Sequence, residues 1–143
     1  MLSNTSKYAI RAVIYLSLNN GKGMKIGIKQ ISKELNIPTP FLGKILQTLA
    51  KHKILASTKG PHGGFGLGKK ADDIKLIDIV DIIDGQDMFQ KCLIRLEDCS
   101  EIESCSMHSK YSEIRSQLLN LFQNQNISDL INDIKEGKRK IIL

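Results

Sequence analysis

Residues 28 to 67 read IKQISKELNIPTPFLGKILQTLAKHKILASTKGPHGGFGL, and the order of their patterns decides the fold. Apolar residues recur at helical spacing from Gly27 to Leu35. That helix stops at Asn36-Ile37-Pro38, because proline and the residue before it disfavour helical continuation. A second helix then begins, with Thr39 as its N-cap and Pro40 at its first position. Two short helices joined by a tight turn predict a helix-turn-helix.

The second helix is apolar on one side and polar and basic on the other, as in a helix that reads the major groove. An ordinary helical hairpin shows the same pattern, but the next segment favours the helix-turn-helix. Ile54 to Lys59 predicts a strand, Phe65-Gly66-Leu67 its partner, and the glycine-rich loop between them a hairpin. A basic hairpin after a recognition helix predicts the wing of a winged helix-turn-helix. The residues expected to contact DNA are Lys29, Thr39, Pro40, Gly43, Lys44, Gln47, Lys51, Lys59, Gly60, Pro61, His62 and Gly63.

Charge is divided unequally along the chain. Residues 1 to 70 contain twelve Lys or Arg and a single acid, Glu34, whereas residues 71 to 143 contain nine Lys or Arg and fourteen acids. A field of one sign, scattered over several elements, favours double-stranded DNA over a membrane surface. We expect one compact, mainly α domain, with a winged helix-turn-helix DNA-binding region at 1–70 and a cysteine loop and dimerisation helix at 71–143.

Three cysteines, Cys92, Cys99 and Cys105, lie close together with His108, and the chain has no other cysteine. The apolar run from Tyr8 to Leu18 is too short for a membrane span and lacks the order of a signal peptide, so we expect a cytoplasmic protein with reduced thiols. Clustered thiols then favour a metal or redox role. The wide spacers suit an iron–sulfur cluster better than a zinc ion, while a zinc site and a thiol switch remain alternatives.

His108 follows Cys105 closely, at the start of a predicted helix, where its ring can complete the ligand set; a lone histidine is otherwise usually a surface residue. An enzyme or electron carrier that uses a cysteine with His108 is the alternative from another class. It leaves the basic half without a function, and the sequence contains no second acid–base constellation.

The helix that begins near Ser109 is long and amphipathic. Because the chain is too short to supply an obvious partner helix, we expect this helix to pair with a second copy in a homodimer. The residues expected at that dimer face are Tyr111, Ile114, Leu118, Leu121 and Phe122.

These pieces together resemble the Rrf-two (Rrf2) family of bacterial transcription regulators, in its IscR and NsrR types. The resemblance is carried by Lys7 to Ala12, by Ile28 to Leu49 as helix-turn-helix, by the wing Thr58 to Phe65, and by the cysteines with His108. It covers nearly the whole chain, and the wing and the cysteine loop are specific in combination.

The resemblance implies a homodimer on an operator of two-fold character, and an iron–sulfur cluster on Cys92, Cys99 and Cys105, [2Fe-2S] in preference to [4Fe-4S], that a purified sample need not retain. His108 matches the histidine ligand of the IscR type, whereas Lys7 stands where NsrR-like members carry an acidic ligand. The recognition helix departs from IscR-like proteins, so the operator need not be theirs.

Overall fold

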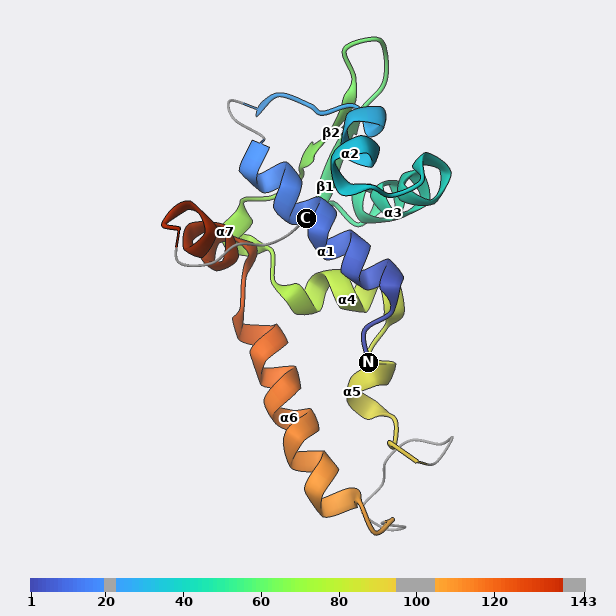
Figure 1. Cartoon of the computed structure of the whole chain (residues 1–143), viewed down its shortest axis with the longest axis vertical. Coiled ribbons are helices and arrows are strands. Elements are labelled where there is room, and N and C mark those ends of the chain that lie inside the picture. Colours follow the sequence, from blue (N-terminus) through green and yellow to red (C-terminus); the bar gives the residue numbers. More distant parts are fainter. Residues whose placement is uncertain (20–22, 95–104, 138–143) are drawn as a thin grey trace.

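The computed structural model describes residues 1–19, 23–94 and 105–137, which form an upper body and a lower projection (Figure 1). The described chain is mainly helical with one β-hairpin, as the sequence predicts. None of its helices is both long and apolar enough to cross a bilayer. The body begins with α1 (Asn4–Asn19), α2 (Ile28–Leu35), α3 (Thr39–Lys51), β1 (Leu55–Thr58) and β2 (Gly64–Leu67).

The turn between α2 and α3 is closed by its own polar groups. Asn36 adopts the left-handed conformation (φ 53°), which asparagine tolerates better than most residues, and the Ile37 N–H donates to the Ser32 carbonyl. The Ser32 hydroxyl donates to the Ile37 carbonyl at 2.5 Å and accepts from the Thr39 hydroxyl at 3.0 Å. The helix begins at Thr39 itself, so the N-cap is Pro38 and not Thr39 as the sequence suggested. These bonds fix how α3 leaves α2.

The wing hairpin is attached to the body by a bridge that the sequence did not indicate. β1 and β2 pair antiparallel, in the register that sets Leu55 opposite Leu67. Phe65 of β2 also exchanges both backbone hydrogen bonds with Ile26, at 2.8 and 2.9 Å. Gly64 has a φ of 149°, and a side-chain carbon there would lie 2.3 Å from the Ile26 carbonyl oxygen. Only glycine fits at this close approach.

The hydrophobic core surrounds α1, which is buried on most sides. Ala12 and Leu16 of this helix are fully buried. Helices α2, α3, α4 and α7 pack around it, so both predicted regions contribute to one core. Each large side chain buried in such a core stabilises the fold by about 1.5–3 kcal/mol. The fully buried residues from the surrounding elements include Ile31, Leu35, Leu42, Leu46, Leu49, Ile74, Ile79 and Ile127.

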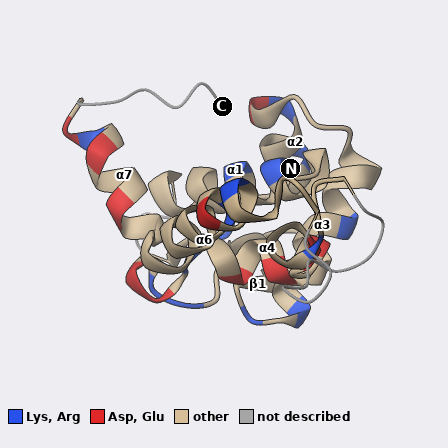
Figure 2. Cartoon of the chain, turned by 90° about the horizontal axis from the view of Figure 1, so that it is seen from below, with Lys and Arg blue, Asp and Glu red and all other residues tan. Residues whose placement is uncertain are grey.

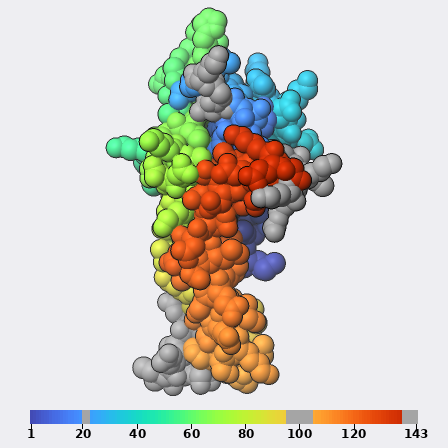
Figure 3. Space-filling view, turned by 90° about the vertical axis from the view of Figure 1, so that its left-hand side faces the viewer, coloured from blue at the N-terminus to red at the C-terminus, as the bar shows by residue number. Residues whose placement is uncertain are grey.

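The second half of the chain leaves the body and returns to it. Its elements are a 3₁₀ turn (Ala71–Asp73), α4 (Leu76–Asp84), α5 (Asp87–Gln90), α6 (His108–Asn124) and α7 (Ile127–Lys135). Figures 1 and 3 show α6 extending away from the body as a projection. Beyond the C-terminal end of α6, the Leu76 N–H donates to the Gln125 carbonyl at 3.0 Å, and the Ile127 N–H donates to the Ile74 carbonyl at 2.9 Å. The two ends of the segment are thereby joined.

Helix α6 has partner helices in its own chain, contrary to the expectation from the sequence. It packs against α4 and α5. The Phe122 and Phe89 rings lie 5.7 Å apart, edge to face, and form a second apolar cluster with Val80. Phe122, expected at the dimer face, is only 7% exposed. Its side chain therefore holds α6 to α5 and α4 within one chain.

Candidate DNA-binding surface and cysteine site

Helix α3 presents the outward residues that the sequence predicts. Pro40, Lys44, Gln47 and Lys51 are exposed, while the opposite side of the helix is buried in the core. Thr39 is half-buried, and its hydroxyl is engaged with Ser32 in the turn. The outward face of α3 can therefore reach base edges and phosphates, whereas Thr39 also has a structural role in the turn.

Gly43 occupies a different position from the other predicted contacts on α3. It is half-buried, and a side-chain carbon added there would lie 3.3 Å from the Ile28 Cδ1 atom of α2. The missing side chain lets α2 and α3 approach closely. Lys29, on the exposed side of α2, lies on the same helix-turn-helix unit and adds a cation to it.

The wing tip exposes Lys59, Gly60, Pro61 and His62. Gly60 has a φ of 107°, and its carbonyl accepts the Gly63 N–H at 3.0 Å, which closes the turn. Gly63 is half-buried, and a side-chain carbon there would lie 2.1 Å from the Thr58 carbonyl oxygen. The tip is therefore a narrow, glycine-built loop that carries a cation and leaves backbone groups open to a neighbouring surface.

Among the described residues of the body, no Lys or Arg of the first half is paired with a carboxylate. Within the described residues, the one salt bridge joins Lys91 to Asp87 at 2.6 Å, far from the helix-turn-helix. No described Lys or Arg of residues 1–70 takes part in one. Figure 2 shows Lys and Arg on α2 and α3 and acidic residues on α7. The positive field of the first half is therefore available to a polyanion.

Phe41 is an exposed aromatic residue that the sequence analysis did not single out. It lies in the first turn of α3 and is 38% exposed. Its ring packs edge to face on Tyr8, with centroids 5.8 Å apart, and the Arg11 guanidinium lies 5.9 Å from the Tyr8 centroid. A large apolar side chain beside Pro40, on the polar side of a helix, is the signal that could have identified it. It extends the outward surface of α3 onto α1.

Two of the four predicted metal ligands come together. Cys92 follows α5, Cys105 precedes α6, and their sulfur atoms lie 3.7 Å apart. His108 is the first residue of α6, and its N–H donates to the Cys105 carbonyl at 2.9 Å. Cys99 lies outside the described residues. Among the residues that are described, no three metal-ligating side chains form a group.

The Cys92–Cys105 separation fits thiolates on one metal atom. Sulfur atoms bound at about 2.3 Å to one tetrahedral metal lie about 3.8 Å apart. A disulfide, at about 2.0 Å, would be much shorter than the observed 3.7 Å. Both side chains are half-buried. The pair is therefore suited to hold a soft metal and remains accessible from solvent.

Arg115 of α6 fixes the backbone that leads into Cys92, a contact that the sequence did not indicate. Its Nη1 atom donates to the carbonyls of Gln90 and Lys91 at 3.2 and 3.4 Å. The same guanidinium lies 5.8 Å from the Tyr111 ring centroid. The C-terminal end of α5 is thereby tied to α6 immediately before Cys92.

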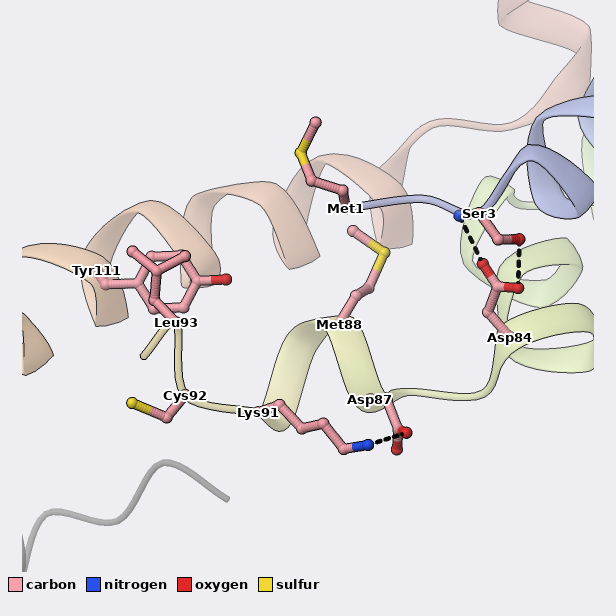
Figure 4. Close-up of a pocket in the computed structure, with 9 residues that line it drawn as sticks. All are labelled: Met1, Ser3, Asp84, Asp87, Met88, Lys91, Cys92, Leu93 and Tyr111. Atoms are coloured by element: carbon pink, nitrogen blue, oxygen red, sulfur yellow. Dashed lines mark hydrogen bonds and ion pairs between the residues drawn. The ribbon is translucent and has the colours of Figure 1, made fainter. Parts of the chain in front are cut away.

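A cavity of about 420 Å³ lies beside Cys92 (Figure 4). At its far end, Asp84 accepts hydrogen bonds from the Ser3 backbone N–H at 3.1 Å and the Ser3 hydroxyl at 2.6 Å. Burial raises the pKa of Asp84, but the hydroxyl groups of Ser3 and Ser6, the Ser3 backbone N–H and the positive N-terminus together outweigh it, so its pKa lies below its ordinary value. This pair joins the start of α1 to the end of α4. The cavity is lined by Met1, Ser3, Asp84, Asp87, Met88, Lys91, Cys92, Leu93 and Tyr111.

An apolar groove of about 370 Å³ adjoins this cavity along α6. Tyr111, Ile114 and Leu118, all expected at the dimer face, line the groove. Ile114 is 61% exposed and Leu121 is 54% exposed, unusually high for large apolar side chains in a folded chain. The exposed part of the predicted dimer face therefore consists of Ile114 and Leu121, and Phe122 is not part of it.

Comparison with known proteins agrees with this arrangement. The Rrf2 family model, described as "Iron-dependent Transcriptional regulator", matches residues 2–133. A candidate HTH-type transcriptional regulator of Aquifex aeolicus (strain VF5) is 37% identical over 134 residues, which cover 92% of each chain. The HTH-type transcriptional regulator IscR of Sodalis glossinidius (strain morsitans) is 25% identical over 132 residues, 92% of this chain and 79% of its own.

Among solved structures, CymR (YrzC), the global cysteine regulator of B. subtilis, is similar with a TM-score of 0.75 and 21% identity, over 91% of this chain and 95% of that chain. At this identity the likeness concerns the fold alone. The family match spans the helix-turn-helix, the wing and α6 together. The chain therefore belongs to the Rrf2 family of DNA-binding transcription regulators and is not an enzyme.

Proposed function

We propose that this chain is a cytosolic, homodimeric regulator that reports iron–sulfur status, redox state or nitric oxide through Cys92, Cys99, Cys105 and His108. The observation that carries the proposal is the 3.7 Å separation of the Cys92 and Cys105 sulfur atoms, beside the helix expected to join two copies. The similarity to IscR over 92% of the chain supports the same assignment.

Side chains and backbone groups of the body would bind a DNA operator. Lys44, Lys51 and Lys59 would bind phosphates together with the wing backbone, while Gln47 and Lys44 would reach base edges. The exposure of these residues and the absence of carboxylate partners in the described body support this role. Phe41 adds an apolar contact beside Pro40, suited to a thymine methyl group.

The homodimer would form along α6, where exposed Ile114 and Leu121 would pack against the same residues of a second copy. Two copies related by a two-fold axis would present two recognition helices to an operator of matching symmetry. Ile114→Glu should shift the full-length protein towards monomer in analytical ultracentrifugation, because it places a charge in a buried contact. The matched control is Gln123→Glu, at an exposed position on the opposite side of the same helix. Equal sedimentation of the two variants would argue against this face.

We infer a [2Fe-2S] cluster in preference to [4Fe-4S], and the separation of the two described cysteine sulfur atoms supports this choice. In a [2Fe-2S] cluster each iron takes two protein ligands, so Cys92 and Cys105 could share one iron at the separation observed. In a [4Fe-4S] cluster each iron takes one, and the thiolates stand further apart. Cys99 and His108 would then serve the second iron. A bound cluster would supply one-electron redox chemistry and a site that oxidants or nitric oxide destroy.

The decisive experiment is anaerobic purification followed by visible spectroscopy and by iron and sulfide analysis. We expect a coloured protein with equal iron and sulfide, and loss of the colour in Cys92→Ser. Operator DNA can be selected by the holo and apo proteins in parallel, and the two should differ in affinity. A colourless, iron-free protein even after reconstitution would reject the cluster.

The alternative keeps the same DNA-binding fold but makes the site a zinc ion or a thiol redox switch without a cluster. The observation in its favour is that the sulfur separation of 3.7 Å suits one tetrahedral zinc as well as one iron. Elemental analysis distinguishes zinc from iron, and thiol counting before and after peroxide identifies a redox switch.

A further inference from the structure

Both cysteines of the described pair are anchored to the same helix. The Cys105 carbonyl accepts the His108 N–H in the first turn of α6. On the other side, Arg115 of α6 binds the carbonyls of Gln90 and Lys91, immediately before Cys92. All of these contacts are hydrogen bonds within the protein itself. They hold the two sulfur atoms together at 3.7 Å with their side chains half-buried.

The two sulfur atoms are not bonded, but a disulfide between them requires only a small movement. The sulfur atoms need to approach by less than 2 Å to reach the bond length of about 2.0 Å. Partial exposure of both side chains gives a small oxidant access to them. Anchoring near a common helix reduces the conformational entropy lost when the bond forms.

We propose that Cys92 and Cys105 form a reversible intrachain disulfide in the metal-free protein on exposure to a hydroperoxide. This proposal rests on the proposed function, because it gives the same site a second mode of regulation. One thiolate attacks the peroxide, the O–O bond breaks, and a sulfenic acid and water form. The second thiol attacks the sulfenic sulfur, the S–S bond forms, and a second water leaves. Two thiols are oxidised, and one hydrogen peroxide is reduced to two waters.

The disulfide and a bound metal exclude each other, because each uses the same two sulfur atoms. The oxidised chain cannot take up metal until a thiol reductant cleaves the bond. The site would thus report both metal supply and peroxide, with the disulfide blocking repair of the metal site while oxidant persists.

The test uses the full-length chain freed of metal by a chelator and treated with one equivalent of hydrogen peroxide. Free thiols are then alkylated and the linked peptides are mapped by mass spectrometry. We expect a Cys92–Cys105 link, one alkylated thiol on Cys99, and reversal by dithiothreitol. Cys99→Ser should form the same link, whereas Cys92→Ser and Cys105→Ser should not.

A predominant link to Cys99, a disulfide between two chains, or stable sulfenic acid in Cys99→Ser would overturn the proposal. Arg115→Ala should slow the formation of the link several-fold relative to the control Gln117→Ala; equal rates would overturn the role given to α6. The outcome is separable from the proposed function. If the protein forms the link but binds no duplex DNA, the disulfide proposal stands and the proposed function as a regulator fails. If it binds duplex DNA but does not form the link, the proposed function stands and the disulfide proposal fails.

Discussion

The body and the α6 projection are built on different principles. In the body, α1 is enclosed by helices from both halves of the chain, and its Ala12 and Leu16 are completely buried. Along α6, Phe122 alone is buried, while Ile114 and Leu121 are more than half exposed. The body is complete as one chain, whereas the projection has an apolar surface and a thiol pair that a second chain and a metal would complete. Most of the buried apolar surface that stabilises the fold therefore lies in the body, whereas the role proposed for the projection is regulation.

The largest expected effect that tests this contrast is a change in the free energy of unfolding. Leu16→Ala removes a fully buried side chain and should lower the free energy of unfolding by about 2–5 kcal/mol. Ile114→Ala, at a residue 61% exposed, should change the unfolding of the monomer by less than about 0.5 kcal/mol. Urea denaturation at low protein concentration measures both. Similar losses for the two variants would abolish the distinction between body and projection.

The wing should be the next most sensitive point. Gly64→Ala places a carbon against the Ile26 carbonyl at a φ unfavourable for alanine, so it should cost about 1–3 kcal/mol and detach the hairpin from the body. DNA affinity should fall with it. The control is Gly27→Ala, where no atom lies within 4 Å of the added carbon. Thermal unfolding measures the stability of the two variants, and fluorescence anisotropy with labelled duplex measures their DNA affinity; both should be lower for Gly64→Ala than for Gly27→Ala. A Gly64→Ala protein with unchanged stability would contradict the close approach to Ile26.

Removal of a single cation from the wing should have a smaller effect, confined to DNA binding. Lys59→Ala should weaken binding to every duplex and reduce the slope of log K against log salt by about 0.9, the value for one lost phosphate contact. Lys135→Ala, on exposed α7, serves as the control and should leave the slope unchanged. Titrations between low and moderate salt measure the slopes. A changed sequence preference with an unchanged slope would mean that Lys59 reads bases instead.

The smallest effect concerns the link between α1 and α4. Because the pKa of Asp84 is lowered in the folded chain, this carboxylate stabilises the fold at pH above its ordinary pKa, and the contribution is lost as pH falls through the folded value. Asp84→Asn should cost less than about 1 kcal/mol at neutral pH and flatten the decline of stability in acid. Asp81→Asn, exposed on the same helix, is the control. Unfolding curves between neutral and acid pH would show whether the two differ.

The sequence predicted most of the body because local signals and tertiary packing agree there. The stop at Ile37-Pro38, the apolar period of α3 and the glycines of the wing each specify their element without reference to distant residues. The bridge between Ile26 and Phe65 was missed, because a single paired residue leaves no periodic pattern.

The sequence was less informative about the projection. Phe122 has the spacing expected of a dimer face, but periodicity does not tell whether an apolar side chain meets its own chain or another. The contact of Arg115 with the end of α5 joins residues distant in sequence and depends on the fold. The cysteine spacing suggested a shared site, and the structure brings Cys92 and Cys105 together. The ligand roles of all four residues, Cys92, Cys99, Cys105 and His108, stay predictions.

The backbone bridge that joins Ile74 and Leu76 to Gln125 and Ile127 closes a segment whose described elements are α4, which packs on α1 in the core, and α5 and α6, which extend beyond it. Its departure and return points are held side by side, so the segment can be exchanged as a unit with its ends at the same separation, provided that the replacement keeps the α4 side chains that pack on α1. Transplanting the segment from a relative that responds to a different signal, with junctions at this bridge, would give a regulator with a new input and the original operator preference.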